Sequence, residues 1–367
     1  MSPPTHWTTD YSRTLSFLRD FWMSEAAPRR PGIILHQYQP VDTPTPTDLD
    51  PERQKALEQV HGALHGRVRN GDDYIPRLST NNGTSAMASA FGTELQDVGG
   101  GHWAETILSG IEEVDHLEKP PVTEARVGEA LEFTRALKLV SDLPICSLDL
   151  QSPLTVATQL LGVTELFMAM YDAPRRVHRL LEIITDFFID VVEAQREIAG
   201  EQYAPVFWPH IWSPAEVGLE LADDYLLTLS PDLYEEFSIP CLNCLSRHFG
   251  GLFLHSCSLY SHHLPVLRKI ESLRGVNCDL SMAAPVRDIL DALDGIVFSP
   301  HVYMNKEITL PSQAEWLKEI LDVWEHGDRL MPVVLAVIYD DAIKGDQQTD
   351  WEECQKAWRK SGTGAGK

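Results

Sequence analysis

A histidine and a cysteine stand two residues apart in LFLHSC, residues 252–257, at the end of an apolar run. Side chains alternate along a β-strand, so His255 and Cys257 are predicted to point to the same face. Zinc prefers imidazole nitrogen and thiolate sulfur in a tetrahedral shell, and this pair can supply two such ligands. The alternative is a hydrogen-bonded core histidine beside a buried thiol, and a lone His-x-Cys pattern does not separate the two interpretations.

Other polar side chains also lie at the ends of apolar runs. The runs predicted as buried strands are 32–38, 143–150, 204–212, 250–257, 274–281, 295–302 and 330–339, and 85–95 is either a strand or a helix end. Their ends carry His36, Asp149, His210, Asp279 and His301 in addition to the His-x-Cys pair. In a parallel barrel the carboxyl ends of the strands meet at one face, so these groups predict a metal or acid–base site there.

Helical patterns fill the gaps between the apolar runs. Residues 172–200 repeat apolar side chains on one helical face. Ser152-Pro153 and Ser230-Pro231 each place a capping serine before a proline that suits the first helical position. This alternation, with roughly eight strands, favours an α/β fold that is a single (β/α)8 TIM barrel over an open doubly wound sheet.

Composition sets the limits on partners and location. The chain has 367 residues and a formal net charge of −24, which disfavours nucleic acid and membrane surfaces as partners. The barrel is predicted over 31–341, after an N-terminal extension (1–30) and before a polar C-terminal tail (342–367). The scattered cysteines do not form a disulfide framework, and no apolar run approaches the roughly 20 residues of a membrane span. Since the N-terminus also lacks signal-peptide features, a cytoplasmic protein is expected.

Several predicted strand-end residues are candidates for substrate contact. His36 ends the first strand and is a candidate general base or pocket donor. Trp208 and His210 lie in WPHIW and either line a pocket or pack among aromatic side chains. Asp149 and Gln151 are placed to hydrogen-bond a substrate, although Asp149 equally suits a cap for the helix that follows. No GxGxxG or Walker sequence is present to support a dinucleotide or ATP site.

Three blocks of the chain, in order, resemble the uroporphyrinogen decarboxylase superfamily. They are AFGTELQDVGGGHWAETILSGIEEVDHLEKP (90–120), LDLQSPLTVATQLLGVTELFMAMYDAPRRVHRLLEIITDF (148–187) and LADDYLLTLSPDLYEEFSIPCLNCLSRHFGGLFLHSCSLYSHHLPVL (221–267). The resemblance covers most of residues 85–325 and implies a single (β/α)8 barrel. One branch of that superfamily decarboxylates tetrapyrrole acetate side chains without a cofactor. The other transfers methyl groups between corrinoid cobalt and a small molecule, with zinc bound by His-x-Cys and a later cysteine.

The chain resembles the methyltransferase branch more closely than the decarboxylase branch. The decarboxylases carry an arginine-rich N-terminal loop, whereas the comparable stretch here has only Arg29-Arg30 and lacks that pattern. The zinc-binding pair is present as His255 and Cys257. The resemblance therefore implies a Zn2+-dependent methyltransferase that acts on an O, N or S atom of a small molecule, with methylcobamide carried by a corrinoid partner protein. A carboxy-lyase of the uroporphyrinogen type and a non-catalytic small-ligand-binding relative are the alternatives.

The third zinc ligand is where the chain departs from the family pattern. The later cysteine of the family falls in a stretch that here reads FSPHVYMNKEITLPS (298–312) and contains no cysteine, which makes His301 the candidate. Cys278 competes with it, but Cys278 and its neighbour Asp279 cannot both face inward from one strand. A second imidazole would make zinc a harder Lewis acid, which favours an oxygen or nitrogen substrate.

Two more residues follow from the resemblance and from proximity to the pair. Asp224 stands where the family places acidic residues near the cavity. It is predicted to be catalytic, orienting substrate or a ligand histidine, unless it is a solvated loop acid. Tyr260, three residues after Cys257, is expected to reach the barrel mouth and contact substrate.

Overall fold

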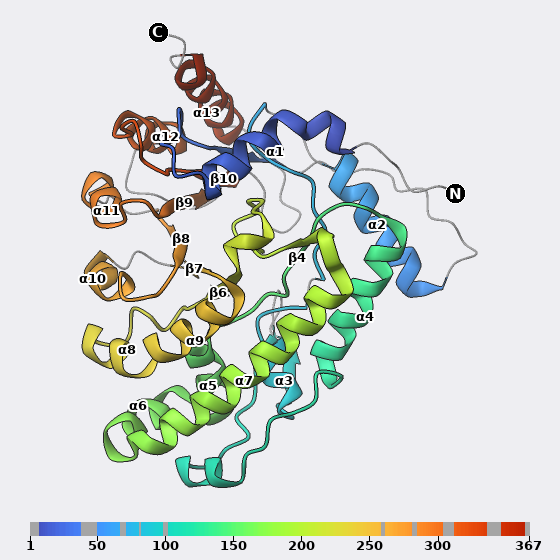
Figure 1. The fold of residues 1–367 in the computed structure, drawn as a ribbon, viewed down its shortest axis with the longest axis vertical. Coiled ribbons are helices and arrows are strands. Elements are labelled where there is room, and N and C mark those ends of the chain that lie inside the picture. The colour runs from blue at the N-terminus through green and yellow to red at the C-terminus, as the bar shows by residue number, and fades with distance from the viewer. Residues whose placement is uncertain are drawn as a thin grey trace.

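A parallel β-sheet surrounded by helices organises the chain (Figure 1). The computed structural model describes residues 7–37, 50–66, 71–80, 82–97, 102–257, 261–280, 285–303, 312–335 and 346–363. Its six-stranded sheet has the order β1-β10-β9-β8-β7-β6. The strands are β1 (Ile34–His36), β6 (Leu219–Ala222), β7 (Leu252–Ser256), β8 (Leu273–Asp279), β9 (Val297–Tyr303) and β10 (Val333–Leu335). All their pairings are parallel, so the carboxyl ends of all six lie at one edge.

Shorter pieces build the rest of the barrel wall. Leu78 forms a parallel bridge to Ile145 of β4 (Ile145–Cys146), and β4 pairs with β5 (Tyr203–Ala204). Further along the same segment, Gln151 bridges to Ala222 of β6. The chain through β4 thus connects the Leu78 segment to the six-stranded sheet, and the fold is an α/β (β/α)8 barrel, as predicted.

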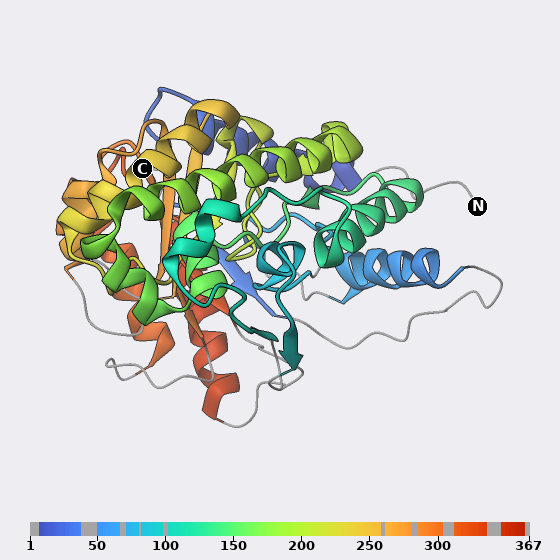
Figure 2. The same ribbon diagram turned by 90° about the horizontal axis from the view of Figure 1, so that it is seen from below.

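Helices cover the outside of the sheet. The long helices α4 and α7 pack against each other and run side by side in both views (Figure 1, Figure 2). The α-helices between the strands are α2 (Pro51–His65), α3 (Ala86–Ala90), α4 (Ala125–Val140), α5 (Pro153–Leu161), α6 (Val163–Asp172), α7 (Pro174–Ala199), α8 (Pro231–Phe237), α9 (Ile239–Phe249), α10 (Leu264–Leu267), α11 (Val286–Ala292) and α12 (Gln313–Asp322). The smaller elements are the antiparallel pair β2 (Leu95–Asp97) and β3 (His102–Ala104), and the 3-10 helices η1 (Ile111–His116), η2 (Gly200–Gln202), η3 (Ala215–Val217) and η4 (Ser261–His263).

Alternation along the strands separates two apolar cores. Leu252 and Leu254 of β7 belong to the large outer core beneath the helices, whereas Phe253 between them belongs to an inner core. Helix α1 (Trp7–Met23) supplies Trp22 to the inner core, where its ring lies 5.9 Å from the Phe253 ring. The Trp22 Nε1–H also donates to Trp212 O at 2.9 Å. The N-terminal helix therefore packs into the base of the barrel, beneath the polar strand ends.

The C-terminal segment, predicted as a polar tail, contains helix α13 (Asp346–Thr363), which packs against α12. Trp351 and Cys354 are buried there, so the polar composition conceals one apolar helix face. In the described ranges no single helix is long and apolar enough to cross a membrane. Only α5 and α6 taken together, bent by 105°, meet that test of length and composition.

Most of the predicted strands are found, with two corrections. The predicted strand 204–212 is wrong, since strand β5 ends at Ala204 and the residues after it form a loop. Strand β6 was missed because LELA is short and carries Glu220 at an inward position. The segment 85–95, for which strand and helix were both open, contains α3.

Candidate metal centre

The register of β7, β8 and β9 sets which side chains share the barrel interior. His255 pairs with Asn277, and Asn277 pairs with Ser299, so these three lie in one row on the same face. Asp279 pairs with His301 one pleat further on, and these two therefore also face the interior. The sheet thus presents imidazole, amide and carboxylate groups toward one space at the carboxyl end of the strands.

Three potential ligands converge beside this row. Donor atoms of Asp224, His255 and Cys257 all lie within 4.8 Å of one another. Cys257 Sγ lies 3.5 Å from His255 Nε2, and the Cys257 backbone N–H donates to Asp224 Oδ1 at 3.0 Å. For tetrahedral zinc with bonds of about 2.3 Å to sulfur and about 2.0 Å to nitrogen, the S···N separation should be about 3.5 Å. The existing spacing of this pair therefore fits a zinc ion.

A hydrogen-bond chain orients the His255 ring. His255 Nδ1 contacts Asn277 Oδ1 at 2.5 Å, and Asn277 Nδ2 donates to the Ser299 carbonyl oxygen. Because the amide nitrogen is used by that carbonyl, Asn277 offers an acceptor to His255, which must carry its proton on Nδ1. Burial lowers the pKa of His255 and favours the neutral ring. Nε2 then presents its lone pair toward Cys257, as a metal ligand requires.

The two candidates for a later ligand lie on opposite faces of the sheet. His301 is buried and its ring centre lies 5.9 Å from that of His255, on the interior face. Cys278 pairs with Ser256 and Pro300, one residue out of step with the interior row, and belongs to the outer core. Burial also raises the pKa of the Cys278 thiol, which disfavours a thiolate.

Aromatic side chains extend the site across the barrel. The Trp208 ring centre lies 6.2 Å from the His255 ring and 5.8 Å from the His301 ring. It also lies 4.8 Å from the ring of His210, which stacks on His36 at 4.5 Å with an interplanar angle of 12°. These predicted site residues therefore form one contiguous group, contributed by β1, by the loop that follows β5, and by strands β7 and β9.

Two buried charged residues that the sequence analysis missed hold this loop. The Glu220 carboxylate accepts from the backbone N–H groups of Phe207 and Trp208. Arg77 donates to the carbonyls of Val206 and Phe207, each at 2.6 Å. It also donates to His210 Nδ1 at 2.9 Å. Burial raises the pKa of Glu220 well above its usual value. A charged residue inside a short apolar run, as in YIPRLS and LELA, was the available signal.

The remaining predicted residues lie beside the metal centre or outside the described chain. Gln151 Nε2 donates to Asp149 Oδ1 at 3.2 Å, next to the bridge that joins Gln151 to β6. Burial raises the pKa of Asp149 to about 6. Asp223, beside Asp224, is fully buried and accepts from the Tyr234 hydroxyl at 3.0 Å, which anchors this corner. Tyr260 lies outside the residues that the structure describes.

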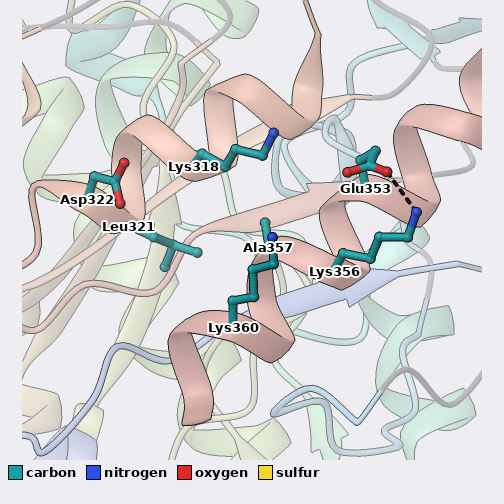
Figure 3. A pocket seen from close by; sticks show the side chains of 7 residues that line it. All are labelled: Lys318, Leu321, Asp322, Glu353, Lys356, Ala357 and Lys360. Atoms are coloured by element: carbon teal, nitrogen blue, oxygen red, sulfur yellow. Dashed lines mark hydrogen bonds and ion pairs between the residues drawn. The ribbon is translucent and has the colours of Figure 1, made fainter. Parts of the chain in front are cut away.

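A separate hollow of about 360 Å³ lies between α12 and α13 (Figure 3). Its lining comprises Lys318, Leu321, Asp322, Glu353, Lys356, Ala357 and Lys360. Lys318 pairs with Glu315 and Lys356 pairs with Glu353, both at 2.7 Å. This surface hollow contains none of the imidazole or thiol groups that converge in the barrel, so it is not the candidate chemical site.

Comparisons with known proteins bear on the family and the fold of the chain. The family model described as uroporphyrinogen decarboxylase (URO-D) matches residues 83–292, a range that contains Asp224, His255 and Cys257. A methyltransferase from Methanosarcina mazei superposes with a TM-score of 0.64 at 16% identity, over 95% of this chain and 98% of that one. A B12-independent methionine synthase from Shewanella sp. W3-18-1 superposes with a TM-score of 0.49 at 10% identity, over 92% and 100%. No curated protein sequence matches. The chain belongs to the uroporphyrinogen decarboxylase family.

Proposed function

We propose that this protein is a zinc-dependent methyltransferase. It moves a methyl group between an O, N or S atom of a small molecule and a corrinoid carried by a partner protein. The observation that carries the proposal is the separation of 3.5 Å between Cys257 Sγ and His255 Nε2, which matches two ligands of one tetrahedral zinc. The likeness to the Methanosarcina methyltransferase supports the fold on which this site stands.

Asp224 is the proposed third ligand. Its carboxylate belongs to the group of donor atoms within 4.8 Å, and the Cys257 N–H fixes one of its oxygens. His301, the ligand expected from the sequence, faces the same space with its ring 5.9 Å from the His255 ring, and is the second candidate. Zinc held there would act as a Lewis acid that polarises the substrate heteroatom or lowers its pKa.

The surrounding side chains have roles that follow from their positions. Asn277 keeps the proton of His255 on Nδ1, so that Nε2 stays available as a ligand. Trp208 lies against His255 and His301 and limits the access of water to that space. His36 stacks on His210, and the two rings stand beyond Trp208 as seen from the metal ligands, where we assign them to contact with bound small molecules.

The decarboxylase alternative has less support from the site. A polycarboxylate substrate needs cationic side chains with donors directed into the cavity. Among the described residues Arg77 is the buried arginine beside this space, and both its terminal nitrogens donate to the loop 206–211. The carboxylates of Asp224 and Asp279 near His255 would also repel such a substrate.

Methyl transfer can be tested with free methylcobalamin in place of the corrinoid protein. The zinc-loaded protein is mixed with a thiol, a phenol and an amine in separate reactions, and the cobalamin absorption spectrum is followed. Acceptor-dependent loss of the methylcobalamin spectrum in the parent, abolished in Cys257→Ser, is expected. Zinc-loaded protein that gives no acceptor-dependent change in either direction of transfer, with or without a corrinoid protein, would overturn the proposal.

A further inference from the structure

The barrel wall has an opening between β1 and the segment around Leu78. Throughout the described residues, β1 pairs with β10 alone, and the Leu78 segment pairs with β4 alone. The edge of β1 that faces away from β10 is bonded to Asp72 and Asp73. The Leu35 N–H donates to Asp72 Oδ2 at 2.8 Å, the preceding Ile33 N–H donates to Asp73 Oδ2 at 3.0 Å, and the Ile33 carbonyl accepts from the Asp73 backbone N–H at 2.9 Å. Two carboxylates and one backbone bond thus stand where a regular strand ladder would close the barrel.

The opposite edge of the opening is satisfied in the same manner. Gln59 of α2 donates from Nε2 to the Ser79 carbonyl at 2.6 Å, and its Oε1 accepts from the Ser79 N–H at 2.9 Å. One side-chain amide therefore occupies both backbone groups that would otherwise face β1. Since the backbone polar groups on both edges have partners, the opening is a stable part of the barrel wall.

A cavity of about 360 Å³ fills this opening. Its outer side is formed by α2, including Glu58, Gln59 and Gly62. Its inner side includes Phe207 and the stacked rings of His36 and His210. This volume falls within the range of small-molecule sites, about 300–1,000 Å³. The cavity therefore reaches from the helix layer to the aromatic group inside the barrel.

Two aromatic rings lie between this cavity and the metal centre. His210 lines the cavity, and its ring centre lies 4.8 Å from that of Trp208. Trp208 in turn lies 6.2 Å from His255, which holds a donor atom of the proposed zinc site. The rings of His210 and Trp208 thus separate the side cavity from the proposed zinc ligands.

We propose that this side cavity is a second small-molecule site, separate from the space at the proposed zinc ligands, and that it takes a flat, uncharged aromatic compound. Trp208 stands between the two sites, so a compound in the cavity does not reach the proposed zinc. The stacked His36 and His210 rings and Phe207 present flat surfaces to a ring. Glu58 lines the cavity and disfavours anions, while the donors of Arg77 are used by the 206–211 loop.

The test uses indole as the probe and substitutions of Gly62, which lines the cavity from the helix. Gly62→Leu fills the space while removing a glycine from a helix interior, so it improves helix propensity. Gly62→Ala makes the same gain in helix propensity but adds only one carbon to the cavity, so it is the matched control. Ala63→Leu narrows the same cavity from the next position and gives a second variant should Gly62→Leu fail to fold. Binding is measured by titration calorimetry with the zinc-loaded and the metal-free protein.

The expected result is indole binding by the parent and Gly62→Ala, weakened about tenfold or more in Gly62→Leu and Ala63→Leu, which corresponds to about 1.4 kcal/mol. Absence of binding in the parent, or equal binding in all variants, would overturn the proposal. Zinc content of the same preparations reports separately on the proposed function. A protein that takes up no zinc but binds indole in this Gly62-dependent manner would retain the side site and lose the methyltransferase mechanism.

Discussion

The two halves of the barrel wall are built by different means. From β6 through β7, β8, β9 and β10 to β1, neighbouring strands are joined by parallel backbone pairing. From β1 back to β6 the wall consists of single bridges at Leu78 and Gln151 and a two-residue pairing of β4 with β5. Side chains such as Asp72 and Gln59 satisfy the strand edges there. The paired half holds the proposed zinc ligands in register, whereas the interrupted half leaves room for a cavity beside them.

The two kinds of wall have different roles: the paired half fixes the positions of side chains, and the interrupted half leaves space for a ligand. In the paired half, the row His255, Asn277 and Ser299 is fixed by backbone register, so the imidazole orientation follows from the sheet itself. In the interrupted half, the loop 205–212 pairs with no strand among the described residues and depends on the side chains of Glu220 and Arg77. Substitutions should therefore affect metal affinity in one half and stability or ligand binding in the other.

The largest effect on stability is expected from Arg77→Met. Arg77 is buried, and its loss leaves the carbonyls of Val206 and Phe207 without their charged donor. The free energy of unfolding should fall by about 3 kcal/mol or more, because unsatisfied buried acceptors each cost about 1–3 kcal/mol. Urea unfolding measures this, with the exposed Arg53→Met on α2 as the control. A decrease no larger than in Arg53→Met would show that Arg77 does not hold the interrupted half.

A smaller effect, confined to the paired half, is expected from Asn277→Leu. Without an acceptor for Nδ1–H, His255 loses its fixed orientation, and zinc affinity should fall about 10-fold to 100-fold. Indole binding in the side cavity should persist, since Asn277 does not line it. Competition with a chromophoric chelator measures the affinity, and Asn277→Asp, which keeps an acceptor, should lose less. Unchanged zinc affinity in Asn277→Leu would break the link between register and metal binding.

The smallest of the three effects is expected at Asp149. This residue lies two positions before Gln151, whose bridge to Ala222 of β6 joins the two halves of the barrel wall. Burial raises its pKa from 3.8 to about 6 in the folded protein, so the folded state retains a proton that the unfolded state releases. Stability therefore falls as pH rises from 3.8 through 6, and the cost is constant above that range. Asp149→Asn removes the charge and with it this pH-dependent cost.

Urea unfolding of the metal-free protein at several pH values tests this prediction. The advantage of Asp149→Asn over the parent should grow between pH 4 and pH 7. A difference in stability that is the same at pH 4 and pH 8 would show that Asp149 is not perturbed, and that the junction is more open to water than its burial indicates.

Regular alternation explains what could be predicted from the sequence. The strands of the paired half carry near-continuous apolar runs, so β7, β8 and β9 and the inward direction of His255 could be read from the pattern. The same alternation separated Cys278 from Asp279, and the structure places them on opposite faces. The zinc role of His255 and Cys257, and the domain boundaries at 30 and 341, stay predictions.

The interrupted half was less predictable, because tertiary contacts decide its structure. The run APVFWPHIW is apolar enough for a strand, but Arg77 and Glu220 take the backbone groups that pairing would need. Strand β6 was missed because a buried glutamate interrupts the apolar pattern of LELA. Asp224 was predicted near the cavity, but its reach to Cys257 depends on the loop after β6, which the sequence pattern does not specify.

The most direct test of the central claim is the zinc content and affinity of the parent, Cys257→Ser and Cys278→Ser. The two substitutions make the same chemical change on opposite faces of the sheet. Asp224→Ala and His301→Ala then identify the third ligand, with loss expected for Asp224→Ala. The account predicts near-stoichiometric zinc in the parent and Cys278→Ser, and its loss in Cys257→Ser. Zinc held as tightly by Cys257→Ser as by the parent would contradict the account.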